Sequence, residues 1–194
     1  MLQRICVFCG SSSGLRPVYR DAARAVGRLL VQRKIGLVYG GGRVGLMGAL
    51  ADSVLEGGGE VVGVIPQALV DKEVGHHGLT QLRIVGSMHE RKALMMDLAD
   101  AFMALPGGYG TLEEFCEVLT WSQLGLHRKP CGLLNVDDYY GALLGLLERA
   151  VSEGFLHPVH RSLVLAESDP ERLLDLLSES QVPHLDKWID RAQL

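Results

Sequence analysis

The chain has 194 residues, of which 47% are hydrophobic and 22% are charged, and its formal net charge is −4. This composition excludes an intrinsically disordered chain, and the length fits a single domain over residues 1–194. The near balance of 19 basic and 23 acidic residues excludes the broad basic surface of a nucleic-acid-binding protein. Any bound anion must therefore be held by a local site.

Short apolar runs alternate with longer amphipathic segments along most of the chain. The expected strands are Arg4–Phe8, Gly36–Tyr39, Val61–Ile65, Leu82–Val85, Ala101–Leu105 and Cys131–Leu134. The expected helices are Tyr19–Gln32, Leu46–Glu56, Met88–Leu98, Leu112–Leu124, Tyr139–Ser152 and Glu171–Ser178. This alternation predicts an α/β fold: a Rossmann-like, doubly wound, mostly parallel β-sheet with helices on both faces. Ligands of such sheets bind beyond the carboxyl ends of the strands, so a site is expected at the strand-to-helix turns.

The N-terminal segment bears on the compartment and on redox chemistry. It enters the first strand without a signal-peptide pattern, and no apolar run approaches the ~20 residues that span a membrane. We therefore expect a cytoplasmic protein with no membrane partner. Cys6 and Cys9 form a C-x-x-C pair, but a redox pair of this kind would open a helix, whereas this one straddles the end of the strand. Buried small side chains are the better interpretation.

The turn Gly40–Gly45 follows a strand, precedes a helix and matches the G-x-G-x-x-G pattern of dinucleotide-binding proteins. That pattern also needs an acidic residue at the end of the next strand, where this chain has Pro66 and Gln67, while Glu60 lies at the opposite end. A P-loop is excluded because no Gly-Lys-Ser/Thr follows the glycines. The alternative that the glycines serve only close packing and positive φ stays open.

A second glycine turn, Pro106–Thr111, lies between the fifth strand and the next helix. Free amides at a helix N-terminus, with the positive end of the helix dipole, favour a bound phosphate. Glu113 and Glu114 follow directly, and they allow two interpretations. Thr111 and Glu114 have the spacing of a capping box, which is a purely structural role. A carboxylate beside a phosphate site is also the group that an enzyme for phosphorylated sugars needs to activate water or stabilise a cation.

The segment Met88–Lys92 opens another predicted helix, and the spacing of Ser87 and Glu90 indicates a capping box. The H-E-x-x-H zinc pattern is absent because its second histidine is missing. Arg91 and Lys92 lie near the positive end of the helix dipole, where adjacent cations are unfavourable. This favours a bound anion over a solvated charged face.

The two segments resemble the motifs of one known family. Pro106–Glu114 matches PGGxGTxxE and Met88–Lys92 matches M-H-x-R-K, the signatures of the LONELY GUY proteins, which are cytokinin riboside 5′-monophosphate phosphoribohydrolases. The likeness extends over most of the chain before Phe155, including Cys9–Ser12 and Tyr39–Gly42. Members of this family are often labelled lysine decarboxylases, but nothing in the chain indicates a pyridoxal phosphate site.

The resemblance implies hydrolysis of the N-glycosidic bond of N6-prenylated AMP, such as isopentenyl-AMP, and of AMP, which releases the free base and ribose 5-phosphate. It implies that Arg91 and Glu114 are catalytic. The substrate-binding residues that it implies are Glu73, Arg91, Lys92, Gly107, Gly108, Tyr109, Gly110, Thr111, Leu112, Glu113 and Thr120. It also implies a homodimer whose subunits meet near the active sites. No cofactor is expected, and no metal is required because the leaving group is a base rather than a phosphoryl group.

The implied chemistry agrees with the residues. Cleavage of a ribosyl C–N bond passes through an oxocarbenium-like state, and the Glu114 carboxylate can stabilise its charge and orient water. Arg91 would fix either that carboxylate or the 5′-phosphate. The alternative from another class is a non-catalytic nucleotide-binding or carrier module on the same scaffold, because fold alone does not determine function. An oxidoreductase is disfavoured because the acidic residue for a cofactor ribose is missing.

Overall fold

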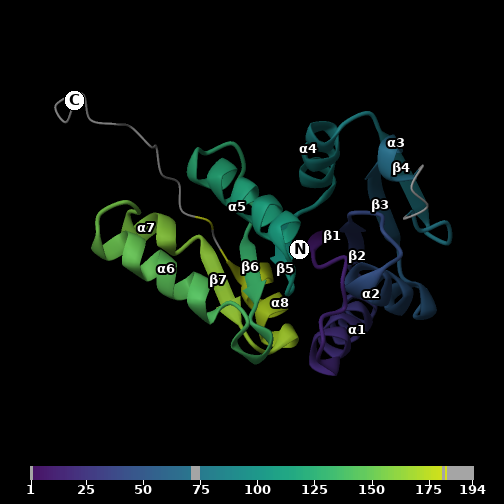
Figure 1. Ribbon diagram of the computed structural model, residues 1–194, viewed down its shortest axis with the longest axis horizontal. Helices are drawn as coiled ribbons and strands as arrows, with labels where there is room; N and C mark the ends of the chain where they lie inside the picture. Colours follow the sequence, from purple (N-terminus) through teal and green to yellow (C-terminus); the bar gives the residue numbers. More distant parts are fainter. Residues whose placement is uncertain (1, 71–74, 181, 183–194) are drawn as a thin grey trace.

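The computed structural model describes residues 2–70, 75–180 and 182. Seven strands in this part of the chain form one sheet, in the order β4-β3-β2-β1-β5-β6-β7. They are β1 (Arg4–Phe8), β2 (Gly36–Tyr39), β3 (Val61–Pro66), β4 (Gln81–Val85), β5 (Ala101–Ala104), β6 (Cys131–Leu134) and β7 (Val164–Glu167). All neighbouring strands pair in parallel, and Figure 1 shows β1 at the centre, with β2–β4 on one side and β5–β7 on the other.

The helices connect the strands and cover the sheet. They are α1 (Pro17–Gln32), α2 (Gly45–Glu56), α3 (Gln67–Val70), α4 (Met88–Leu98), α5 (Tyr109–Gln123), α6 (Gly141–Ser152), α7 (Pro158–Arg161) and α8 (Pro170–Glu179), with a short 3-10 helix, η1 (Val136–Asp138). None of the helices in the described ranges is long and apolar enough to cross a membrane. The predicted doubly wound α/β fold is confirmed, and the sheet is parallel throughout.

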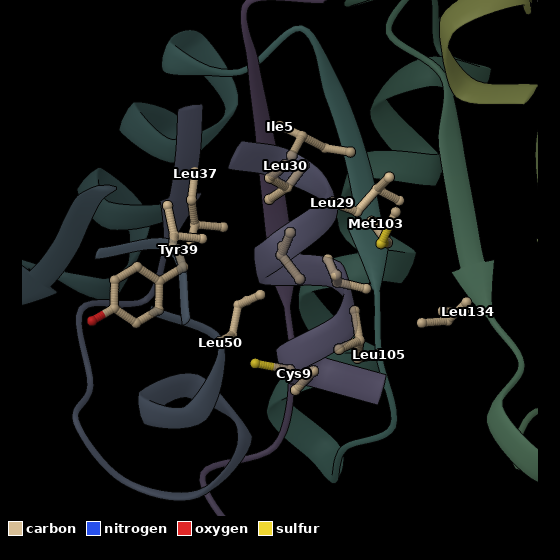
Figure 2. Packing of buried hydrophobic residues seen from close by; sticks show 14 of the residues in the cluster. Ile5, Cys9, Leu29, Leu30, Leu37, Tyr39, Leu50, Met103, Leu105 and Leu134 are labelled. Atoms are coloured by element: carbon tan, nitrogen blue, oxygen red, sulfur yellow. The ribbon is translucent and has the colours of Figure 1, made fainter. Parts of the chain in front are cut away.

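Two hydrophobic clusters fill the layers on the two faces of the sheet. Because side chains alternate along a strand, Ile5 and Val7 of β1 enter one cluster, whereas Cys6 and Phe8 enter the other. The first cluster contains buried side chains of α1, α2 and α8, and Figure 2 shows Leu30 of α1 packed over β1. The second contains side chains of α4, α5 and α6. Helices thus cover both faces, as the apolar strands predicted.

The C-x-x-C pair is divided between these two clusters. Cys6 and Cys9 are both buried free thiols, and they belong to the clusters on opposite faces of the sheet. Burial raises the pKa of each thiol well above its usual range. The prediction that these cysteines are buried small side chains, rather than a redox pair, is confirmed.

The strand order reverses between β1 and β5, and the turns that follow these two strands meet there. Gly10 donates a backbone hydrogen bond to the Pro106 carbonyl at 3.1 Å. A Cβ atom on Gly10 would lie 3.3 Å from the Gly107 Cα, so the two turns are in contact. A crevice at such a reversal is where open α/β sheets bind ligands.

Candidate active site

A cleft lies beyond the carboxyl ends of β1 and β5. It consists of two adjoining cavities of about 280 and 310 Å³, which share Gly10, Ser11 and Gly108 as lining residues. The smaller cavity contains Arg91 and Glu114. Together the cavities fall in the size range of small-molecule sites.

Helix α5 begins at Tyr109, three residues before the predicted start. Gly108 is the N-cap residue, and no side chain in the described ranges caps the helix, so the predicted capping box of Thr111 and Glu114 is wrong. Thr111 instead lies buried in the first turn, and Glu114 is buried against Arg91. The residues of the uncapped first turn line the cleft, which is the arrangement that favours an anion there.

Arg91 and Glu114 form a buried ion pair at the floor of this cleft. Arg91 Nη2 lies 3.2 Å from Glu114 Oε1, and the two side chains are 10% and 9% exposed. The Arg91 Nε also donates to the Val64 carbonyl of β3 at 3.1 Å. A Cβ atom on Gly40 would lie 2.1 Å from Arg91 Nη2, so this glycine leaves room for the guanidinium. Arg91 is thus held from both sides of the strand reversal.

The surroundings of Glu114 set its protonation. Burial raises the pKa of Glu114 above its usual range, and the positive charge of Arg91 opposes that shift. A carboxylate in a water-poor cleft interacts strongly with a developing positive charge, because little solvent screens it. The Glu114 carboxylate can therefore stabilise a positive charge that develops close to it.

The Lys92 ammonium group forms ion pairs with two carboxylates of α5. Its Nζ lies 2.5 Å from Glu113 Oε1 and 3.0 Å from Glu117 Oε1, and its side chain is 11% exposed. These contacts raise the pKa of Lys92, the hydrogen bond to Glu113 most of all. The two adjacent cations of α4 are thus explained by acidic residues of the neighbouring helix, and they do not require a bound anion.

The N-terminus of α4 carries the predicted cap. The Glu90 amide donates to Ser87 Oγ at 3.1 Å, while the Glu90 carboxylate accepts from the Gly86 amide at 2.9 Å. The Glu90 side chain thus bonds to the amide of Gly86, which precedes the N-cap residue Ser87, whereas in a standard capping box it would bond to the amide of the N-cap residue itself. This cap fixes the first turn of α4, from which Arg91 extends toward Glu114.

The structure brings most of the sequence-predicted site residues together. Arg91, Gly107, Gly108, Tyr109, Gly110, Thr111, Glu113 and Glu114 line the two cavities. Leu112 is half-buried and packs against the cluster beneath α5, so it is not part of the lining. Thr120 lines a separate groove and donates a hydrogen bond to the Cys116 carbonyl at 2.8 Å. Glu73 lies outside the described residues.

The cleft also contains residues that the sequence did not single out. Met47 of α2 lines the smaller cavity, while Tyr19 of α1 and Tyr139, which precedes α6, line the larger one. The order of the strands in the sheet could have indicated these three residues. They follow strands whose carboxyl ends meet at this edge of the sheet, so their elements must begin beside the cleft.

Comparison with known proteins places the chain in a family. A family model described as "Possible lysine decarboxylase" matches residues 47–177. The chain is 57% identical over 177 residues to a probable cytokinin riboside 5′-monophosphate phosphoribohydrolase of Oryza sativa subsp. japonica, covering 91% of this chain and 78% of that protein. It is 52% identical over 185 residues to a cytokinin riboside 5′-monophosphate phosphoribohydrolase of Arabidopsis thaliana, covering 95% and 85%.

Solved structures share the fold at lower identity. The molybdenum cofactor binding protein of Rippkaea orientalis superposes with a TM-score of 0.68 at 22% identity, over 92% of this chain and 96% of that chain. The molybdenum cofactor carrier protein of Chlamydomonas reinhardtii superposes with a TM-score of 0.67 at 17% identity, over 92% and 98%. These likenesses concern the fold alone. The sequence matches, in contrast, show that the chain belongs to the LONELY GUY family.

Proposed function

We propose that the protein hydrolyses the N-glycosidic bond of cytokinin riboside 5′-monophosphates, which are N6-prenylated forms of AMP, and of AMP itself. The products are the free base and ribose 5-phosphate. The observation that carries this proposal is the buried pair of Arg91 and Glu114, 3.2 Å apart, beside the uncapped first turn of α5. The names and identities of the plant relatives support the same reaction.

The proposed reaction gives a role to each part of the cleft. The first turn of α5 and the adjoining glycine turns hold the 5′-phosphate, because their backbone approaches a ligand closely and carries the positive end of the helix dipole. The ribose then lies over Glu114, whose carboxylate stabilises the oxocarbenium-like state. Arg91 fixes this carboxylate by a charge-assisted contact and so keeps it aimed at the sugar.

The reaction consumes one water molecule. Glu114 orients the water, whose oxygen forms the new bond to C1′ of the ribose. The N-glycosidic bond breaks and its electron pair goes to the base. The attacking water gives up one proton and the base takes one up, so the protons balance. We expect the reaction to need no metal, because the Glu114 carboxylate is the group proposed to orient the water and to stabilise the ribosyl cation. Equal turnover with and without EDTA is therefore the expected result, and loss of activity that added metal restores would contradict metal independence.

The deciding experiment incubates the protein with AMP and with isopentenyl-AMP and detects the free base. We expect release of adenine or isopentenyladenine, with adenosine a poorer substrate by roughly 10²–10⁴ in kcat/KM, since it lacks the phosphate. Binding of both nucleotides without release of base would support the carrier module instead. The structures of molybdenum cofactor carriers with this fold make that the rival to exclude.

We also propose that the protein is a homodimer. Cys116, Leu119 and Thr120 of α5 line a groove of about 160 Å³ together with Leu147 of α6, and no residue of α6 is fully buried. Burial of this apolar face against a second copy would remove it from water and place Thr120 at the interface. Light scattering is expected to give twice the mass of the chain. A fully active monomer would contradict the proposal.

A further inference from the structure

The turn between β6 and α6 adopts a conformation that few sequences accept. Asp137 and Asp138 both have positive φ, at 51° and 58°, in the left-handed region that only glycine enters without strain. Asn135 holds the turn in this form: its Nδ2 donates to Asp138 Oδ1 at 3.0 Å, and its Oδ1 accepts from the Tyr140 amide at 2.7 Å. Strain of this kind persists where the surroundings enforce it, and it is concentrated at functional sites.

The strained turn directs two consecutive tyrosines at the glycine turn after β5. The Tyr139 hydroxyl donates to the Gly107 carbonyl at 2.6 Å, and the Tyr140 hydroxyl donates to the Leu105 carbonyl at 2.6 Å. The carbonyl between them, on Pro106, accepts from the Gly10 amide at 3.1 Å. Three consecutive carbonyl groups ahead of α5 thus have fixed partners.

Further contacts hold the Tyr139 ring in place. It meets the Tyr19 ring edge-on at 5.8 Å and the Tyr140 ring edge-on at 5.0 Å between centroids. Arg16, just ahead of α1, forms an ion pair with Asp137 and so ties the strained turn to the other half of the sheet. The Tyr139 hydroxyl is therefore presented to Gly107 from a fixed direction.

We propose that Tyr139 is a positioning residue for the 5′-phosphate, an inference that rests on the proposed function. Its hydroxyl holds the Gly107 carbonyl, and through it the peptide that precedes the N-cap of α5, in the orientation that leaves the first-turn amides free for the phosphate. A carbonyl oxygen that is free to rotate toward a phosphate would repel it. Tyr140 is buried in the core, and its hydroxyl binds the Leu105 carbonyl at the end of β5. Tyr139, in contrast, lines the larger cavity.

Tyr139→Phe tests this assignment because it removes the hydroxyl and keeps the ring. The KM for AMP and the dissociation constant of ribose 5-phosphate are expected to rise about 5- to 20-fold, the effect of one hydrogen bond to a site that holds a charge. We expect kcat to change less than about 3-fold, because Glu114 and Arg91 are untouched. Binding of adenine, which has no phosphate, is expected to stay as in the wild type.

Tyr39→Phe is the matched control. Tyr39 ends β2 ahead of the glycine turn Gly40–Gly45, and its buried hydroxyl has no hydrogen-bond partner in the described part of the chain. Figure 2 shows this hydroxyl directed away from the labelled aliphatic side chains. We expect Tyr39→Phe to leave all three constants unchanged.

Asp137→Ala provides a second variant whose exposed position spares the core. Alanine enters the left-handed region less readily than aspartate, and the ion pair with Arg16 is lost, so the same selective weakening of ribose 5-phosphate binding is expected. Unchanged binding of ribose 5-phosphate in folded Tyr139→Phe would overturn the proposal, as would an equal loss of adenine binding. A wild type that binds ribose 5-phosphate but releases no base would refute the proposed reaction alone.

Discussion

Glu114 is the side chain on which the proposed chemistry depends, and a single substitution isolates its charge. Glu114→Gln keeps the shape and the hydrogen-bonding reach of the side chain but removes the negative charge. We expect turnover of AMP to fall roughly 10²–10⁴-fold, because the ribosyl cation loses its counter-charge. Initial rates of base release measure this loss, and ribose 5-phosphate binding is expected to stay near the wild type. The melting temperature is expected to fall, because the buried Arg91 guanidinium loses its counter-charge.

Glu113→Gln serves as the control for this substitution. Glu113 precedes Glu114 and pairs with Lys92 from a half-exposed position, so its charge is screened and is not aimed at the sugar. We expect a modest change in KM and little change in turnover. Near-normal turnover in Glu114→Gln would exclude the proposed mechanism, though not the nucleotide site.

The raised pKa of Glu114 predicts the pH dependence of turnover. The carboxylate must be ionised to stabilise the cation, so kcat is expected to fall with falling pH through a pKa above the ordinary glutamate value of about 4.3. Arg91 opposes the effect of burial on this pKa. Arg91→Lys loses the planar fork that fits a carboxylate, so the acid limb of the kcat profile is expected to move to higher pH.

This comparison separates Glu114 from the substrate. The phosphate of AMP also titrates, near pH 6, but its titration is the same for both enzymes. A shift of the acid limb between the wild type and Arg91→Lys therefore reports on the enzyme. Identical acid limbs would show that Glu114 is not the group that titrates.

Among structural elements, the turn that opens α5 makes two distinct demands on its glycines. A Cβ atom on Gly107 would lie 2.1 Å from Thr111 Oγ1 and 2.9 Å from the Gly10 amide nitrogen, whereas a Cβ atom on Gly110 would meet nothing within 4 Å. We expect Gly107→Ala to lower the free energy of unfolding by about 1–3 kcal/mol through overpacking. Gly110→Ala is expected to be neutral or up to about 1 kcal/mol more stable.

Gly110→Ala is expected to impair activity although it does not impair stability. Its Cβ atom would enter the open cleft where the phosphate is proposed to bind, so the KM for AMP should rise roughly 10-fold or more despite normal stability. Urea titration and steady-state kinetics on the two variants measure the two effects. Wild-type kinetics in Gly110→Ala would place the phosphate elsewhere, and the turn would then require glycine for packing at position 107 but not at position 110.

The elements that the sequence predicted well are those with strong local signals. The bounds of β1, β2, β6 and α4 agree with the structure, because short apolar runs and a Ser-x-x-Glu cap identify them without tertiary information. The short strand β7 was not predicted: Val164–Glu167 is brief, ends in a charged residue and is preceded by a single helical turn. Its strand state comes from pairing with β6, which the local pattern does not contain.

The start of α5 shows why the site was only partly predictable. Gly108, Tyr109 and Gly110 have low helix propensity, so the sequence favoured Thr111 as the cap, but in the structure Gly108 is the N-cap and the helix begins at Tyr109. That earlier start changes Glu114 from a capping residue into a partner of Arg91. The motifs identified this segment from the sequence. The ion pair of Arg91 with Glu114 and the proposed positioning role of Tyr139, in contrast, depend on strands that are distant in sequence.

At the scale of the whole molecule, the cleft lies where two halves of the sheet join. Arg91 contacts Val64 of β3 in one half and Glu114 of α5 beside the other, and a ligand there contacts turns from both. A ligand that binds only when the two halves of the sheet are folded against each other stabilises the entire fold. We expect ribose 5-phosphate at 100 times its dissociation constant to raise the melting temperature by about 5–10 °C.

Thermal melts with ribose 5-phosphate, adenine and no ligand test this expectation. Adenine is expected to shift the melting temperature less at the same concentration, because it has no charge for the α5 terminus to hold. Gly110→Ala should lose most of the shift with ribose 5-phosphate. A full shift in that variant would mean that the ligand stabilises the protein from another place.

The distribution of the cysteines makes the protein convenient to label. Cys6, Cys9 and Cys131 are buried, and Cys116 alone of the four is exposed, on α5 in the groove beside α6. A maleimide dye or spin label is therefore expected to attach to the native protein at one position without any engineering. Partial burial raises the pKa of Cys116, so labelling is slow at neutral pH and faster in mildly alkaline buffer. That thiol lies on the surface where a second subunit is proposed to dock. If the subunits associate there, the labelling rate of Cys116 is expected to fall as the protein concentration rises, so the rate measures association directly.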